Sequence, residues 1–200
     1  MMLGTNTDIK KLTENWIPEN SLGAEIGIWR GDSSKLLLTK CRHLHMIDPY
    51  NISVYENTTD WLNMGYEGIL KRYSSLVGST NPADFQKFYD DLYLTVCQDF
   101  KDLPATIHRM TSREWFSSYT GEKLDWIYID GDHSYEGVME DLVSSLDVVK
   151  QNGLIFVDDY SVDNRLHPGV RAAVRDFCYE RELKFSRLYI NACMIELGAI

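Results

Sequence analysis

The sequence predicts an α/β protein built on a doubly wound, mostly parallel sheet that ends in an antiparallel hairpin. Short apolar runs alternate with amphipathic stretches along the 200 residues, which is typical of strands joined by crossover helices. The last two apolar runs meet near Asn191, and so short a connection requires an antiparallel pair. With 44% hydrophobic residues the chain can bury one sizeable core, so a single domain over residues 1–200 is expected.

Five apolar runs bounded by turn or charged residues are predicted to form the parallel part of the sheet. The fourth and fifth of them each deliver a carboxylate at the carboxyl end, and this placement matters for the site. The predicted strands are residues 22–28, 43–47, 105–110, 125–130 and 153–158.

Two helices and a hairpin complete the predicted core. Residues 135–149 place apolar side chains at helical spacing with acids opposite, which predicts a crossover helix. Residues 167–182 form a second candidate, with Pro168 near the start. The hairpin is predicted from residues 184–190 and 192–197.

Residues 50–104 are too long for a plain connection and are predicted to form a helical insertion, with helices at about 60–76 and 82–100. Three roles stay open for this segment: extra cover over one sheet face, a substrate lid, or a dimer contact. Several aromatic side chains are candidates for an acceptor pocket: Trp61, Tyr66, Tyr89, Tyr93, Tyr135 and Tyr160.

Charge and hydropathy exclude several classes of partner. The chain has 20 basic and 30 acidic side chains, and its net charge of −10 opposes binding to nucleic acid or to an anionic membrane. No stretch is long and apolar enough for a membrane span, and the N-terminus lacks the apolar region of a signal peptide. Four widely spaced cysteines are expected to be reduced core thiols, so a cytoplasmic location is expected.

A glycine-containing loop follows the first predicted strand. Gly27 and Gly31 permit a tight turn, and the helix after them would expose backbone N–H groups able to hold a carboxylate or phosphate. A dinucleotide fold would have G-x-G-x-x-G here. This chain has G-x-x-x-G with the bulky Trp29 in place of the second glycine, which argues against close approach of a pyrophosphate.

Asp48 ends the next predicted strand, 23 residues after Glu25. Neighbouring strand ends converge on one crevice in a doubly wound sheet, so this acid is placed to accept both hydrogen bonds of a ribose diol. An ordinary turn aspartate before Pro49 is the alternative.

Four acids follow the two strongest strands: Asp130, Asp132, Asp158 and Asp159. Side chains of like charge at adjacent strand ends repel one another unless a cation lies among them or some are protonated. Oxygen ligands with one nearby imidazole favour Mg²⁺, Mn²⁺ or Ca²⁺ over zinc. Other acids, such as Asp32 and Asp141, are expected to be solvated capping or turn residues.

In combination these motifs resemble the class I S-adenosylmethionine (SAM)-dependent methyltransferases, which have a Rossmann-like sheet. Within that class the chain resembles the metal-dependent catechol and caffeoyl-coenzyme A O-methyltransferases and the macrocin-type sugar O-methyltransferases. The catechol type has an aromatic residue in the middle of the glycine loop and a serine two residues past the last glycine. Gly27, Trp29, Gly31 and Ser33 match that arrangement.

The resemblance implies a role for each matching position. The loop residues and Glu25 would surround the methionine end of SAM, Asp48 would hold the ribose, and Ser112 would lie by the adenine. Asp130 would lie beside the cofactor as well. The implied ligands of Mg²⁺ or another divalent cation are Asp130, Asp158 and Asp159.

The general base is left with two candidates. The catechol type has a lysine three residues after the first metal ligand, where this chain has His133, and the macrocin type uses the second acid of Asp-Gly-Asp, here Asp132. His133 is slightly preferred because an unperturbed imidazole titrates near neutral pH.

The resulting hypothesis is methylation of a hydroxyl on a small molecule, such as a sugar, polyol or catechol-like acceptor. Related O-methyltransferases are commonly dimers, so the resemblance also suggests a homodimer. The alternatives are a metal-independent N- or C-methyltransferase, a nicotinamide oxidoreductase, and a SAM-binding subunit without activity.

Overall fold

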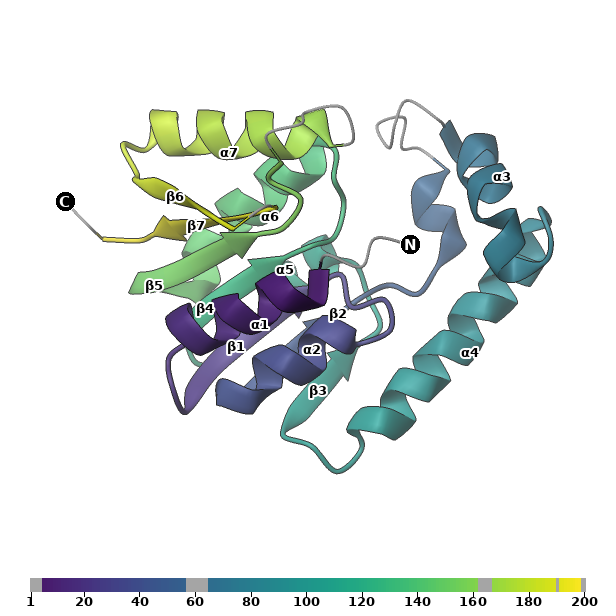
Figure 1. Ribbon diagram of the computed structural model, residues 1–200, viewed down its shortest axis with the longest axis horizontal. Helices are drawn as coiled ribbons and strands as arrows, with labels where there is room; N and C mark the ends of the chain where they lie inside the picture. The colour runs from purple at the N-terminus through teal and green to yellow at the C-terminus, as the bar shows by residue number, and fades with distance from the viewer. Residues whose placement is uncertain (1–4, 57–64, 162–166, 190, 199–200) are drawn as a thin grey trace.

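A computed structural model describes residues 5–56, 65–161, 167–189 and 191–198 and contains one seven-stranded sheet (Figure 1). The strand order is β3-β2-β1-β4-β5-β7-β6. Strands β1 to β5 pair in parallel, whereas β7 pairs antiparallel with both β5 and β6, which confirms the predicted fold class. The strands are β1 (Ser21–Ile26), β2 (Cys41–Ile47), β3 (Ala105–His108), β4 (Leu124–Ile129), β5 (Val149–Val157), β6 (Phe185–Leu188) and β7 (Ala192–Glu196).

The helices that the sequence predicts are present, and two further helices accompany them. The insertion helix predicted at residues 82–100 has those bounds, whereas the start of the one predicted at 60–76 lies outside the described residues. Helices α1 and α5 were not predicted. The helices are α1 (Thr5–Trp16), α2 (Asp32–Leu37), α3 (Gly65–Val77), α4 (Pro82–Phe100), α5 (Ser112–Ser118), α6 (Tyr135–Val148) and α7 (Pro168–Glu180), with 3-10 turns η1 (Leu38–Lys40) and η2 (Ile52–Tyr55).

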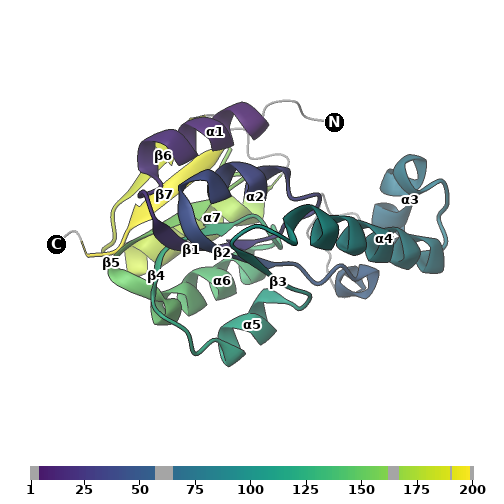
Figure 2. The same ribbon diagram turned by 90° about the horizontal axis from the view of Figure 1, so that it is seen from below.

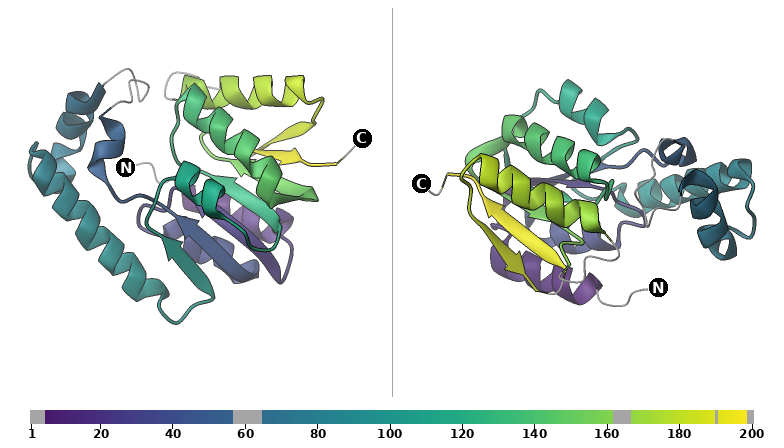
Figure 3. Two further views of the ribbon diagram at one scale, coloured as in Figure 1. Left: turned by 180° about the vertical axis from the view of Figure 1, so that it is seen from behind. Right: turned by 90° about the horizontal axis from the view of Figure 1, so that it is seen from above.

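Helices cover both faces of the sheet. Figure 2 shows α1 and α2 on one face and α5 and α6 on the other, and Figure 3 shows α5, α6 and α7 together from behind. Alternate residues of the central strands enter the two cores: Trp126 and Tyr128 pack with α1 and α2, whereas Ile127 and Ile129 pack with α6 and α7. Both faces are therefore apolar, and polar groups gather where the strands end.

The insertion projects beyond the sheet edge rather than covering a face (Figure 2). Helix α4 starts at Pro82 with the Asn81 side chain accepting from the Ala83 N–H, and its other end anchors in the core through Phe100. Its start packs with η2 and α3 in a small separate cluster that includes Phe85. The insertion is thus held at both ends and overhangs the strand ends.

The four cysteines are all free thiols, two of them buried and two half-buried. Within the described ranges, no helix combines the length and apolar character that crossing a bilayer requires.

We predict that Gly23→Ala destabilises the fold by about 2–3 kcal/mol through overpacking. A Cβ on Gly23 would lie 2.2 Å from Cζ2 of Trp126, a fully buried indole fixed by a 2.9 Å hydrogen bond to Ser21 Oγ. Urea unfolding measures the loss. The same change in a Trp126→Phe background should cost less, because the smaller ring leaves room; equal costs in both backgrounds would contradict the contact.

Candidate active site

A cavity of about 750 Å³ opens at the carboxyl ends of the parallel strands. It lies where β1 and β4 are neighbours and the chain order reverses, which is the expected ligand position in a doubly wound sheet. The glycine loop, the β4–α6 loop and the start of α5 line one part of it. Residues of η2, α3 and α4 line the rest: Val54, Tyr55, Ile69, Tyr73, Leu76, Val77, Phe85, Phe88 and Tyr89.

Gly27 allows two strand ends to approach closely. Its φ is +84°, and a Cβ there would lie 2.0 Å from the Asp130 carbonyl oxygen. The loop that follows places Ser33 in the cavity wall at the start of α2. Gly27 therefore positions the glycine loop directly against the residue predicted as a cation ligand.

Trp29 connects the glycine loop to the insertion. Its backbone has φ of +52°, and its ring packs 5.8 Å from the ring of Phe88 and 5.9 Å from that of Tyr89. The Tyr50 hydroxyl donates to the Trp29 carbonyl at 3.0 Å. Trp29, which stands where a dinucleotide-binding loop would have its second glycine, thus forms part of the cavity wall.

Asp48 lines the cavity and also holds the glycine loop. One carboxylate oxygen accepts from the backbone N–H groups of Ile28 and Trp29 at 3.0 and 3.1 Å, and the other accepts from Tyr50 N–H at 2.8 Å. Burial raises the pKa of Asp48, and these three hydrogen bonds oppose that rise. The acid is fixed in place, and of the roughly four lone-pair sites of a carboxylate about one, on Oδ1, is left for a ribose hydroxyl.

Glu25 does not line the cavity, although it was predicted among the cofactor-binding residues. Its side chain is fully buried and accepts from the hydroxyls of Ser33, at 2.5 Å, and Ser34. Burial raises its pKa to about 8. Glu25 therefore joins β1 to α2 beneath the cavity. Gly31, with φ of +75°, also stays out of the wall and packs against Phe100.

Asp141 is buried, so the expectation that it is a solvated acid was wrong. It lies on α6, is 2% exposed, and shares the cavity wall with Ser112, which hydrogen-bonds its carboxyl group. Burial raises its pKa to about 7. The sequence offered no distinction between this acid and its exposed neighbours, because a helical period assigns Asp141 a face but not a cavity.

Three of the four acids predicted at the ends of β4 and β5, Asp130, Asp158 and Asp159, lie close together, and His133 lies between two of them. His133 Nε2 is 3.3 Å from Asp130 Oδ1 and 3.2 Å from Asp159 Oδ2. Asp130 and Asp158 line the cavity, whereas Asp159 lies beside them. Asp159 has φ of +54°, an uncommon backbone conformation for aspartate outside turns.

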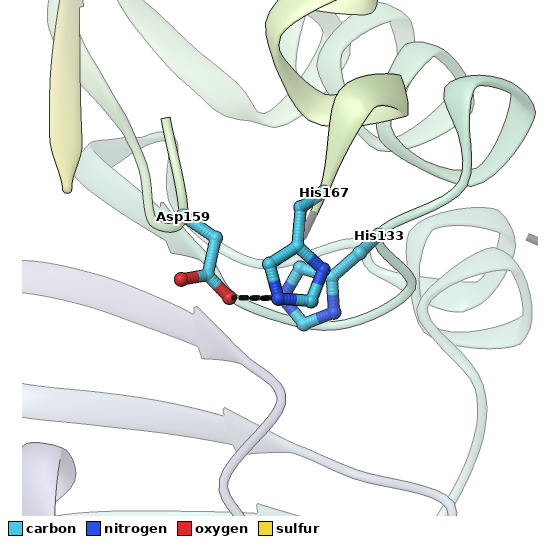
Figure 4. Close-up of side chains that lie close together, drawn as sticks. All are labelled: His133, Asp159 and His167. Carbon is cyan, nitrogen blue, oxygen red and sulfur yellow. Dashed lines mark ion pairs between the residues drawn. The ribbon is translucent and has the colours of Figure 1, made fainter. Parts of the chain in front are cut away.

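His167 was missed by the sequence analysis. Its Nε2 lies 3.3 Å from Asp159 Oδ2, and its ring centroid is 4.4 Å from that of His133 (Figure 4). The packing of α7 brings it there: a Cβ on Gly169 would lie 2.5 Å from the Tyr135 backbone nitrogen. The helix start thus contacts the β4–α6 loop at van der Waals range.

Burial and mutual charge dominate the electrostatics of this cluster. Burial and the neighbouring acids raise the pKa of Asp130 and place that of Asp158 well above its usual value. Burial opposes charge on His133, but its contacts with Asp130 and Asp159 outweigh burial and raise its pKa to about 10. Burial also opposes charge on Asp159, yet His133 lowers its pKa. The acids therefore coexist next to a positive imidazolium, one of the solutions that like charges require.

This arrangement changes the comparison of the two base candidates. His133 is held protonated by two carboxylates, so it is a poor acceptor at neutral pH. Asp132 is exposed in the cavity wall, with one oxygen accepting from Ser134 N–H at 2.9 Å. Of the two candidates, Asp132 therefore has an exposed side chain in the cavity wall, whereas His133, the slightly preferred one, is engaged by two carboxylates.

The aromatic pocket was predicted only in part. Tyr89 lines the cavity, Trp61 lies outside the described residues, and the other four candidates are not in the wall. Tyr55, Tyr73, Phe85 and Phe88 line it instead. Their spacing along η2, α3 and α4 gave no signal that distinguished cavity from core.

Comparison with solved structures identifies the fold as that of the class I SAM-dependent methyltransferases. A protein assigned as a caffeoyl-CoA O-methyltransferase from Staphylococcus aureus has a TM-score of 0.62 at 15% identity, covering 98% of this chain and 84% of the other. An O-methyltransferase from Bacillus cereus in complex with SAH (S-adenosylhomocysteine) gives 0.56 at 12% identity, covering 99% and 82%. The N-methyltransferase NodS from Bradyrhizobium japonicum gives 0.58 at 12%, covering 96% and 94%.

Residues 24–160 match the model of a family described as a methyltransferase domain. The chain therefore belongs to this methyltransferase family and is a SAM-dependent enzyme, so the oxidoreductase and inactive-subunit alternatives are set aside. No curated protein matched the sequence. At the identities above, the structural likeness shows the fold and leaves the acceptor atom open.

We predict that the stability of the wild type falls as the pH rises from 4.5 to about 8, and that Glu25→Gln abolishes this fall. The folded-state pKa of Glu25 is raised from 4.5 to about 8, so its contribution to stability is fully present below pH 4.5 and is lost as pH rises through 8. The loss is on the order of a few kcal/mol. Urea unfolding across this range should show a flatter profile for the variant, whose amide mimics the neutral acid.

Glu67→Gln is the control for this measurement. Glu67 is an exposed acid on α3, so its substitution should leave the wild-type profile unchanged. Parallel profiles for Glu25→Gln and wild type would show that Glu25 is ionised in the folded state.

Proposed function

We propose that the protein transfers the methyl group of SAM to a hydroxyl of a small molecule, with a divalent cation held by Asp130, Asp158 and Asp159. The observation that carries this proposal is the convergence of these carboxyl groups beside a cavity of about 750 Å³ at the strand ends. The family membership supplies the methyl transfer. The choice of oxygen and the cation are the proposed parts.

The residues present fit a divalent cation. Burial and mutual repulsion raise the pKa of Asp130 and Asp158, so a positive charge among them would be strongly favoured. Carboxylate oxygens are the ligands of hard cations such as Mg²⁺. When bound, the cation would supply the charge that lowers the pKa of an adjacent acceptor hydroxyl.

The donor would occupy the part of the cavity formed by the glycine loop and α5. Ser33 and the loop backbone would hold its methionine end, with Trp29 in the wall beside them. Asp48 would accept from the ribose, and Ser112 with Asp141 would contact the adenine. Because Glu25 fixes Ser33 from below, it would act as a positioning residue.

The acceptor would lie against the insertion. The wall from η2, α3 and α4 is mainly aromatic and aliphatic, which favours an aryl acceptor of the catechol type over a sugar. Asp132 would take the hydroxyl proton while the oxygen attacks the methyl carbon and the carbon–sulfur bond breaks, leaving SAH. Alignment by the cavity walls would provide much of the acceleration.

A metal-independent N- or C-methyltransferase is the second candidate. One observation favours it: His133 already places a positive charge among the acids. The structural likeness to an N-methyltransferase is compatible with it as well.

We predict that Asp158→Ala lowers methyl transfer by on the order of 10²-fold or more while SAH binding is retained, because the carboxylate would hold the cation and not the donor. The rate of methyl transfer is measured with labelled SAM and catechols, sugars and amines as acceptors. SAH binding is measured by calorimetric titration. EDTA should inactivate the wild type and Mg²⁺ or Mn²⁺ should restore it.

Asp147→Ala at the end of α6 is the matched control and should be fully active. Full turnover by Asp158→Ala or by EDTA-treated enzyme would exclude the cation, and transfer to amines alone would exclude O-methylation.

We predict that Asp132→Asn lowers kcat by about 10²-fold to 10⁴-fold with little change in SAH affinity, because an amide cannot take the proton. Glu136→Gln serves as control, because Glu136 is an exposed acid in the first turn of α6, close to Asp132 in the chain. An unchanged kcat for Asp132→Asn would remove it as the base.

A further inference from the structure

His133, Asp159 and His167 form a group of side chains with the spacing of a metal site. One ligand atom from each lies within 4.8 Å of the other two, and Asp159 Oδ2 is 3.2 Å from His133 Nε2 and 3.3 Å from His167 Nε2. All three come from different segments: the β4–α6 loop, the end of β5 and the start of α7.

These distances match the edges of a metal coordination shell. Nitrogen and oxygen ligands bind zinc at roughly 2.0–2.2 Å, which puts neighbouring ligand atoms roughly 2.8–3.6 Å apart across octahedral and tetrahedral geometries. Asp130 Oδ1, 3.3 Å from His133 Nε2, is at the same spacing and faces the cavity. A cation next to Asp159 would therefore have two imidazoles within reach as well as the carboxylates.

The surroundings hold this group in place. The two imidazole side chains are only 17% and 10% exposed, so they are not loose surface histidines. The left-handed backbone of Asp159 directs its carboxylate toward both rings (Figure 4). The glycine at position 169 lets α7 start in contact with the loop that carries His133.

We infer that the cation site contains His133 and His167 as ligands together with Asp159, and that it selects a first-row transition metal over Mg²⁺. This rests on the proposed function, and it changes the ligand set and the class of metal. Imidazole suits Fe²⁺, Co²⁺, Ni²⁺ and Zn²⁺, whereas an all-oxygen set suits Mg²⁺. With His133 as a ligand, proton removal is left to Asp132.

The competing interpretation is a plain ion-pair cluster in which protonated His133 neutralises the acids and no metal binds. Both interpretations use the same contacts, so the test must read metal binding directly rather than activity.

The experiment titrates metal-free protein with Co²⁺ and with Mg²⁺, following Co²⁺ electronic absorption and calorimetric heat. We expect the wild type to bind Co²⁺ at least 10-fold more tightly than Mg²⁺. His167→Gln should weaken Co²⁺ binding by at least about 10-fold to 100-fold, because loss of even an outer partner of a metal ligand costs that much, with little effect on Mg²⁺. His133→Gln is the second variant and should act in the same direction.

His45→Gln is the matched control, because His45 lies 3.1 Å from His108 in a separate histidine cluster on β2 and β3 that could bind metal adventitiously. It should leave the Co²⁺ spectrum unchanged. SAH titration and the thermal midpoint check that each variant is folded.

Preference for Co²⁺ that is lost in His167→Gln and His133→Gln supports the inference. Equal Co²⁺ affinity in wild type and both variants, with binding abolished by Asp158→Ala, overturns it and leaves the proposed function standing. A Co²⁺ signal lost only in His45→Gln overturns it too. No cation binding, with EDTA-resistant methyl transfer, overturns both the inference and the cation-dependent function.

Discussion

The site depends on one constraint: parallel strands end at the same edge, so the carboxyl groups that follow β4 and β5 cannot avoid each other. Asp130, Asp158 and Asp159 are gathered by the sheet register, and burial makes their mutual repulsion costly. The protein offsets this with the His133 imidazole, whose pKa the acids raise to about 10, while burial and the neighbouring acids hold the pKa of Asp158 well above its usual value. A bound cation would therefore take the place of the positive charge that His133 already provides among these acids.

The cavity is assembled from two parts of different origin. The sheet edge supplies the polar groups, and the insertion supplies an apolar wall that overhangs them. Trp29 joins the parts by contacting both Phe88 and Tyr89 of α4. Trp29, which argues against dinucleotide binding, therefore also joins the glycine loop to the insertion.

What the sequence predicted follows from periodicity and strand ends. The fold class, the helix at residues 82–100 and the meeting of the acids required only local patterns and the parallel topology. His167 could not be placed, because its position depends on how α7 packs on α6, and its only signal is Gly169 near a helix start. Asp141 was misjudged because burial of one helical acid depends on its neighbours in three dimensions.

The glycine loop illustrates the same division between pattern and packing. Its sequence predicted a donor site, yet the two acids next to it act on the protein itself. Glu25 fixes α2 through two serines, and Asp48 fixes the loop through the backbone N–H groups of Ile28 and Trp29. These hydrogen bonds join groups of the protein itself and so order the loop. Little binding energy is then spent on ordering it, and more remains for aligning the reacting atoms.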